Sequence, residues 1–407
     1  FVRMSGSAKD MPDSYDYLMP SGSDSGKQPK IEYLADTFDS KGKVFFDIRR
    51  RILAERCYFC HSAIQANLEK WETDEDVHLA SGLTCVDCHR NEVNHNMIRG
   101  YEGESAVSKN PIADDFSCKG CHLPEKESKV SLGARLGAPV PQHKGLPEIH
   151  LEKLTCTACH SGQWPQDETV RVKTSMAHGL GIYDSDKSAD ALPHIAAVVF
   201  AKNADGKIAP HNLIWPAFWA TLKDDKITPL SPDTVKPVIE QVVTDKASQF
   251  TDEQVAKILA ALTSEGTVEG KVVYICGGEM HSLNEDKLVS AEHSSAEAFL
   301  WPVGHNVRPA AQSLGIGGCA DCHNTKKPFF FGNVAVDSTI ASQTGFVKMI
   351  KFAGVDPCYT KIFASSLLLY RCIAILVAVA CAVVAVVAVV YALAGLTRLL
   401  KMIARKD

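Results

Sequence analysis

The sequence predicts a mainly α-helical protein with little regular structure around its N-terminal motifs, a small α+β insert and a single C-terminal transmembrane helix. Three features of the 407-residue chain support this fold class. Four copies of a Cys-x-x-Cys-His pattern crowd the segment between Cys57 and His160. A long stretch with ordinary helix and strand signals separates them from a fifth copy. The chain then ends in a long uncharged apolar run.

The composition is that of a folded protein, with 45% apolar residues, 22% charged residues and a formal net charge of -5. The charges form no extreme block, so a nucleic-acid partner is not expected. Residues 1–42 start with a stretch rich in Ser, Gly, Asp and Pro that lacks apolar periodicity, which predicts a mobile N-terminal segment. Residues 43–56 are expected to form a helix that leads into the first motif.

The repeated motif has the chemistry of covalent haem attachment. Two thiols add across the two vinyl groups of haem, and the adjacent imidazole binds the iron. A single Cys-x-x-Cys would also fit a zinc site or a redox dithiol, but five copies, each followed by histidine, predict five covalently bound haem c groups. The motif residues are Cys57, Cys60 and His61; Cys85, Cys88 and His89; Cys118, Cys121 and His122; Cys156, Cys159 and His160; and Cys319, Cys322 and His323.

The spacing of the motifs predicts the domain organisation. Four motifs leave little room for a conventional core, so haems are expected to form most of the core of a tetrahaem domain over residues 43–180. Residues 181–300 form a haem-free α+β insert, with a helix capped by Ser231, another started by Thr251 and Gln254, and a hairpin within residues 269–290. Residues 301–345 carry the fifth motif.

A haem iron with one histidine ligand keeps a second axial position, and its occupant separates an electron relay from a catalyst. Ten histidines lie outside the motifs. The preferred distal ligands are His78, His95, His150, His178 and His305, with His143 and His293 as reserves. His211 and His281 are expected to be solvent-facing or hydrogen-bonded instead.

The apolar run Cys372–Leu396 is 25 residues long and uncharged. A helix of that length spans about 37 Å, enough to cross a hydrocarbon core of about 30 Å. Residues 346–371 form a juxtamembrane segment and residues 397–407 a cytoplasmic basic tail. Positive charges nearly balance on the two flanks, but haem is attached outside the cytoplasmic membrane, which places the haem domain on the periplasmic side. Export also implies a signal peptide, either removed or upstream of the given sequence.

Two further features leave alternatives open. Cys276 and Cys358 could form a disulfide in an oxidising compartment, although the sequence does not place them together. Trp215, Pro216 and Trp219 are either contacts for a partner subunit or part of the core of the insert.

Two stretches resemble bacterial multihaem c-type cytochromes, including distant relatives in the octahaem tetrathionate reductase and hydroxylamine oxidoreductase group. These are Gly82–Arg90 with His95–Met97, and His305–Ala310 with Gly318–His323. The chain departs from that group in having five motifs rather than eight and a terminal anchor. The resemblance implies periplasmic haem wiring with mostly bis-histidine irons, and the reductase activity is not carried over.

The sequence therefore predicts a membrane-anchored pentahaem cytochrome that relays electrons between a membrane respiratory partner, linked to quinone, and periplasmic redox proteins. It is an electron-transfer subunit rather than a self-standing enzyme, so no catalytic residue is assigned. The transmembrane helix would contact the lipid bilayer and integral membrane subunits. Chain order places the fifth haem nearest the membrane. The alternative is a catalytic reductase or oxidase of a small sulfur or nitrogen compound, which needs an iron with an open axial site.

Overall fold

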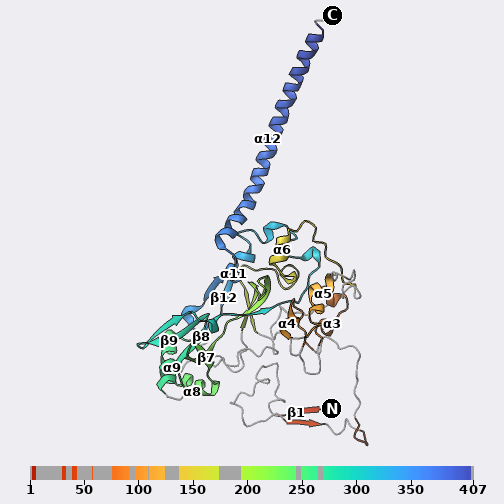
Figure 1. The fold of residues 1–407 in the computed structure, drawn as a ribbon. Helices are drawn as coiled ribbons and strands as arrows, with labels where there is room; N and C mark the ends of the chain where they lie inside the picture. The colour runs from red at the N-terminus through yellow and green to blue at the C-terminus, as the bar shows by residue number, and fades with distance from the viewer. Residues whose placement is uncertain are drawn as a thin grey trace.

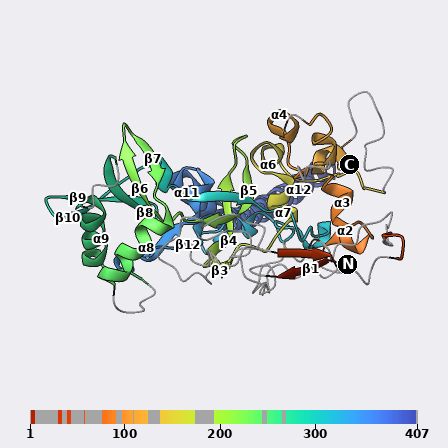
Figure 2. The same cartoon turned by 90° about the horizontal axis from the view of Figure 1, so that it is seen from below.

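The computed structural model describes residues 2–5, 30–33, 39–43, 57, 76–90, 97–108, 110–123, 137–173, 194–243, 249–264 and 269–404. A body of short helices and antiparallel sheets carries a long C-terminal helix, α12, that projects away from it (Figure 1). Seen along the direction of this helix, the two larger sheets and the motif-bearing helices occupy opposite ends of the body (Figure 2). A small hairpin of β1 (Val2–Ser5) and β2 (Lys30–Tyr33) lies near the N-terminus.

The motif-bearing part consists of very short helices, because each motif supplies only one helical turn. They are α2 (Val77–Ala80), α3 (Cys85–Cys88), α4 (Glu104–Ser108), η5 (Asp114–Phe116), α5 (Cys118–His122), α6 (Glu148–Lys153) and α7 (Cys156–His160). The turns are fixed by caps: Asp76 accepts from amides of α2, and Ser117 Oγ accepts from the Gly120 amide in α5 at 3.1 Å. Capping rather than helix length therefore stabilises this region.

Two antiparallel sheets make up most of the remaining body. The first has the order β11-β5-β4-β3 and the second the order β10-β9-β8-β6-β7. The strands of the first sheet are β3 (Val170–Lys173), β4 (His194–Lys202), β5 (Ile208–Ile214) and β11 (Phe299–Pro302). Those of the second are β6 (Phe218–Lys223), β7 (Lys226–Pro229), β8 (Lys271–Cys276), β9 (Glu279–Asn284) and β10 (Lys287–Ala291). The first sheet therefore crosses both predicted boundaries of the insert.

Each larger sheet has its own apolar core. Phe200 and Leu213 of the first sheet pack with residues of α10 (Pro328–Phe331) and α11 (Met349–Ala353). In the second core, Trp219 stacks on Tyr274 with ring centroids 4.0 Å apart, beneath α8 (Pro232–Val242) and α9 (Asp252–Ser264). A hairpin of β12 (Asn333–Val336) and β13 (Gly345–Lys348) leads toward the C-terminal helix. Three single-turn 3-10 helices complete this part: η7 (Ser294–Ala296), η8 (Ala310–Gln312) and η10 (Ala341–Gln343).

The predicted helix starts and the hairpin of the insert are confirmed. Ser231 caps α8, and Pro237 lies inside that helix without delaying its start. Ahead of α9, the Thr251 amide donates to Gln254 Oε1 at 2.8 Å and the Gln254 amide donates to Thr251 Oγ1 at 3.2 Å. The expected hairpin is present as β8 and β9 and is extended by β10. The helix expected over residues 43–56 falls almost entirely outside the described residues.

A mainly α-helical fold is not supported, because about 21% of the chain is strand. The excess comes from β4 to β7, whose mostly buried residues do not alternate cleanly between polar and apolar positions. Strands buried on both faces lose the alternation that identifies a half-exposed strand in a sequence.

The predicted apolar run lies within α12 (Pro357–Ile403), which is 47 residues long and starts at an Asp356 cap whose side chain accepts from the Tyr359 amide at 2.6 Å. A continuous helix of this length measures about 70 Å, so it includes much of the juxtamembrane segment as well. Among the described residues, α12 is the helix that is long and apolar enough to cross a membrane.

Candidate haem-binding sites

Each described motif folds as one helical turn that starts at, or includes, its first cysteine. The turns are α3, α5, α7 and η9 (Cys319–Asp321). Residues three apart in a helical turn lie on the same side, so both sulfurs of a motif face one direction and the histidine follows at the end. Of the first motif, Cys57 is described, whereas Cys60 and His61 lie outside the described residues.

The third motif also needs its glycine. A Cβ atom on Gly120 would lie 2.6 Å from the carbonyl oxygen of Asp115 and closer still to that of Asp114. The 3-10 helix η5 therefore crosses directly against α5, and only a residue without a side chain fits at this position.

Every described motif histidine faces a second histidine from elsewhere in the chain. The ring centroids are 5.7 Å apart for His89 and His305 and 6.0 Å apart for His122 and His78. They are 6.3 Å apart for His160 and His143 and 6.0 Å apart for His323 and His150. Four such pairs, each containing one motif histidine, form a consistent structural unit.

The spacing within the pairs fits an iron atom between the two rings. A transition metal binds imidazole nitrogen at about 2 Å, so two opposed imidazoles would have ring centres about 6 Å apart. The measured separations of 5.7 to 6.3 Å match this value. In the His89 and His305 pair the two Nε2 atoms approach to 3.4 Å, which shows that these nitrogens face each other.

The other ring nitrogen of several of these histidines is held by a backbone carbonyl. Nδ1 lies 2.6 Å from the Ile98 oxygen in His89, 2.8 Å from the Pro139 oxygen in His122 and 3.3 Å from the Arg308 oxygen in His160. A carbonyl accepts a proton, so these contacts place the N–H on Nδ1 and leave the Nε2 lone pair available for a metal.

Burial supports the same protonation state. It lowers the pKa of His160 and the pKa of His323, so both rings are neutral near pH 7. Neutral imidazole is the form that binds a metal. The described cysteine and histidine geometry therefore fits covalent haem with two axial histidines.

Asp76 connects two of the facing histidines. Its Oδ1 accepts from the His78 amide at 2.8 Å, and its Oδ2 accepts from the Val307 amide, two residues beyond His305, at 2.8 Å. Burial raises the pKa of Asp76, but the hydrogen bonds from His78 and Val307 outweigh it, so the net pKa is lowered. An ionised, 5% exposed carboxylate thus holds together segments more than 200 residues apart.

Consecutive motifs lie next to one another. The Cys57 and Cys85 side chains are hydrogen-bonded, and so are those of Cys118 and Cys156. Burial, followed by the neighbouring Cys121 sulfur, raises the pKa of Cys88 to about 11.

The last link joins the fourth and fifth motifs. Burial, followed by the Cys159 sulfur, raises the pKa of Cys322 to about 12. The five motifs are therefore adjacent in chain order, first to second, second to third, third to fourth and fourth to fifth. Bound haem would convert these sulfurs to thioethers.

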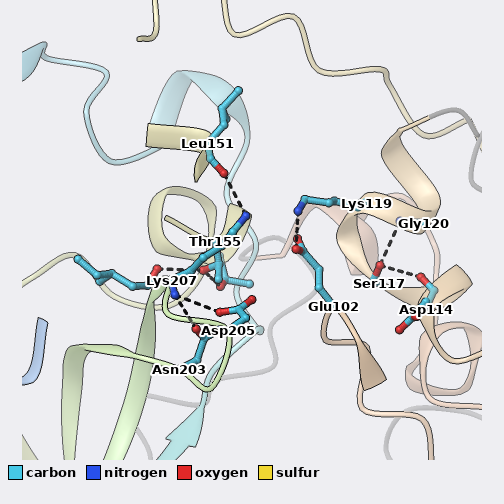
Figure 3. Close-up of polar contacts among 12 residues, drawn as sticks. Glu102, Asp114, Ser117, Lys119, Gly120, Leu151, Thr155, Asn203, Asp205 and Lys207 are labelled. Carbon is cyan, nitrogen blue, oxygen red and sulfur yellow. Dashed lines mark hydrogen bonds and ion pairs between the residues drawn. The ribbon is translucent and has the colours of Figure 1, made fainter. Parts of the chain in front are cut away.

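Charged groups surround the contact between the third and fourth motifs. Lys119, inside the third motif, forms an ion pair with Glu102 at 2.5 Å (Figure 3). Lys207, from the turn between β4 and β5, donates to the Leu151 carbonyl in α6 at 3.1 Å (Figure 3). The Thr155 amide, just ahead of α7, donates to the Ile208 carbonyl at 3.0 Å. The first sheet therefore positions the helices that carry His150 and the fourth motif.

The fifth motif lies against the long C-terminal helix. The Phe363 ring of α12 meets the His323 ring edge-on, with centroids 4.8 Å apart. Figure 1 places α6, which carries His150, beside the base of α12, while α3 lies lower in the body. The His150 and His323 pair is therefore at the foot of the apolar helix.

The structure brings three of the five preferred distal histidines, His78, His150 and His305, opposite motif histidines. His95 and His178 lie outside the described residues. The reserve His143 occupies the fourth pair, at a φ of 40° in the left-handed region that side chains rarely adopt. No local pattern marks His143, because the approach of its ring to His160 is decided by tertiary structure.

The remaining histidines of the insert have structural surroundings. His211 is buried, with Nδ1 2.8 Å from the Ala209 oxygen. His281 is buried beside Ser290, and His293 accepts from the Ser295 amide as a cap, so the reserve reading of His293 is not supported.

Two open alternatives are resolved. Cys276 and Cys358 are both free thiols, the first buried and the second exposed at the start of α12, so they form no disulfide. Trp219 is fully buried, and Trp215 donates from Nε1 to the Ala335 oxygen at 2.9 Å. These tryptophans are therefore core residues and not contacts for a partner.

Comparison with known proteins gives two family matches. The family described as cytochrome c7 and related cytochrome c matches residues 71–161, and the family described as cytochrome c554 and c-prime matches residues 31–90. Neither the curated proteins nor the solved structures give a match. The two matched regions contain the first four motifs, and they support a multihaem c-type cytochrome with covalently bound haem c that transfers electrons.

Proposed function

We propose that this multihaem c-type cytochrome is a membrane-anchored pentahaem electron relay. The observation that carries the proposal is the set of four facing histidine pairs, because two strong protein ligands on each iron leave no position for a substrate. Haem supplies an iron that alternates between ferric and ferrous states. The chain supplies the ligands, fixes their orientation through Nδ1 contacts and keeps the sites close together.

The axial pairs are His89 with His305, His122 with His78, His160 with His143, and His323 with His150. Their ring separations support this assignment. His61 of the first motif then takes its partner from His95 or His178. With all six positions of each iron filled, the preferred reading is transfer of electrons rather than the chemistry of a small sulfur or nitrogen compound.

The haems form a single file in chain order. The sulfur contacts between consecutive motifs support this order, because neighbouring attachment sites place neighbouring macrocycles close together. The first haem is one terminus and the fifth haem the other. The contact between His323 and Phe363 supports the fifth haem as the membrane-side terminus.

The apolar part of α12 crosses the cytoplasmic membrane, with the haem domain on the periplasmic side and the basic tail in the cytoplasm. The fifth haem then exchanges electrons with an integral membrane, quinone-linked partner beside α12. The first haem exchanges electrons with a periplasmic redox protein. The length and apolar surface of α12 support the span, and the site of haem attachment supports the orientation.

Spectroscopy of the purified full chain tests the relay. We expect five haems per chain and low-spin, six-coordinate signals from all of them. Replacing His143 with alanine should convert one haem to a high-spin state, whereas His293→Ala, the matched control in the insert, should convert none. A high-spin haem in the wild-type protein would favour the catalytic alternative.

Cell fractionation tests the anchor separately. The full chain should sediment with membranes, and a chain ending at Leu369, which keeps Phe363, should be recovered in the soluble periplasmic fraction with its haems. Recovery of the full chain in the soluble fraction would contradict the anchor while leaving the haem assignment intact.

A further inference from the structure

Arg308 lies three residues beyond His305 and pairs with the fourth motif through its backbone. Its amide donates to the His160 carbonyl at 2.6 Å, and its own carbonyl lies 3.3 Å from His160 Nδ1. Its guanidinium donates to the Gly162 carbonyl at 2.5 Å and to the Cys159 and Ser161 carbonyls, each at 3.4 Å. The side chain is therefore fixed at the end of α7.

The charge of Arg308 is only partly compensated. Its guanidinium lies over the Trp164 ring at 5.8 Å, and no carboxylate pairs with it within the described part of the chain. Its Nε is buried and has no partner among these residues. Burial lowers the pKa of Arg308, which reflects the cost of holding a charge there. Carbonyl dipoles do not cancel a full charge, so a half-buried guanidinium needs an anion.

Arg171 shows the usual arrangement in the same chain. Its guanidinium donates to the Val336 carbonyl and also lies 3.8 Å from the Asp337 carboxylate. Arg308 has the carbonyl partners but lacks the carboxylate. An open cavity of about 380 Å³ adjoins it, lined also by Val77, Ala80, Gly162 and Asn306. This cavity gives room for a carboxylate that does not belong to the protein.

We infer that Arg308 binds a haem propionate and supplies its counter-charge. The inference rests on the proposed haem sites, since the propionate belongs to a haem bound in that array. Two haems could provide the carboxylate: the one between His160 and His143, which Arg308 contacts through the backbone, and the one between His89 and His305. A planar guanidinium with an unused Nε–H suits a carboxylate, which accepts paired hydrogen bonds from arginine.

The charge has a defined effect on reduction. A positive group beside a haem favours the ferrous state, because reduction removes one positive charge from the iron site. Without Arg308, the propionate would also remain an uncompensated anion, which further favours the ferric state. Its pKa would rise, so the potential of that haem would become pH-dependent and fall as the pH increases.

The test is a spectroelectrochemical titration of the full chain carrying Arg308→Gln, which keeps hydrogen-bond donors but removes the charge. One haem should shift about tenfold toward the ferric state, equal to a potential about 59 mV lower for one electron. Arg308→Lys, which keeps the charge, should stay within about twofold of the wild type. The matched control Arg171→Gln should change no potential.

Two additions make the result unambiguous. Combining Arg308→Gln with His143→Ala, which marks the fourth haem as high-spin, shows which of the two haems shifts. If Arg308→Gln fails to assemble, Arg308→Lys decides: an unchanged potential supports the inference, and a tenfold shift overturns it. Unchanged potentials in an assembled Arg308→Gln protein would also overturn it. High-spin haem in the wild type would instead count against the proposed relay.

Discussion

Replacing Asp76 with asparagine tests how two distant segments are held at their irons. The aspartate accepts from His78 and Leu79 in α2, at 2.8 and 3.4 Å, with one oxygen and from Val307 at 2.8 Å with the other. Asparagine has nearly the same shape but only one oxygen. Asparagine and aspartate are similar helix caps, so the oxygen can stay on α2 while the new NH2 group faces the Val307 amide.

The magnitude follows from this mismatch. A hydrogen bond to a charged acceptor contributes about 1.5 to 3 kcal/mol, and a buried donor left unpaired costs a similar amount. Asp76 is 5% exposed, so water does not easily replace the lost acceptor. The segment carrying His305 should lose about 2 to 3 kcal/mol of holding free energy. Transient release of His305 should then become about 30- to 150-fold more frequent.

Carbon monoxide measures that release, because it binds ferrous haem only when a distal ligand leaves. We expect the reduced Asp76→Asn protein to bind carbon monoxide at one haem about 30- to 150-fold faster than the wild type, with other haems unchanged. Asp356→Asn is the matched control, since Asp356 caps α12 alone. Equal rates in wild type and Asp76→Asn, or the same acceleration in Asp356→Asn, would refute the reasoning.

Three further outcomes are expected. The lowered pKa of Asp76 contributes stability that is present above its unfolded pKa of about 3.9 and lost as the pH falls through the lower folded value. Carbon monoxide binding to the wild type should therefore accelerate below about pH 4, and Asp76→Asn should lack this acceleration. Gly120→Ala should yield a chain whose intact mass is one haem lower, because the added Cβ clashes with η5, whereas Lys119→Ala should keep every haem. Trp219→Ala should reduce the free energy of unfolding by about 3 to 5 kcal/mol, followed by circular dichroism, without changing any haem spin state, and a spin change would place Trp219 in the haem region instead.

The attachment motifs could be read from the sequence because their chemistry is local. Two thiols and one imidazole within five residues define one helical turn, and residues such as Thr84 and Ser117 start those turns as caps. The same holds for the capping box of α9 and for the apolar run of α12. Each of these features depends on neighbours within a few residues.

The sheets of the insert were not predicted from the sequence, because strands buried on both faces have no polar alternation. β5 is almost entirely buried, and β4 and β6 place tightly packed residues such as Phe200 and Trp219 among small apolar ones. The pairing of β5 with β11 joins segments more than 80 residues apart, which leaves no short-range signal.

The amino-acid sequence by itself determined where haem is attached, which residues cap the attaching turns and where an apolar helix lies. Only the tertiary structure decided which histidine faces which motif, because His305 and His150 reach His89 and His323 across most of the chain. It also decided that Asp76 holds two of those segments and that Arg308 is left without a carboxylate. Attachment depends on bonds between near neighbours, whereas axial pairing depends on long-range packing that no local pattern encodes.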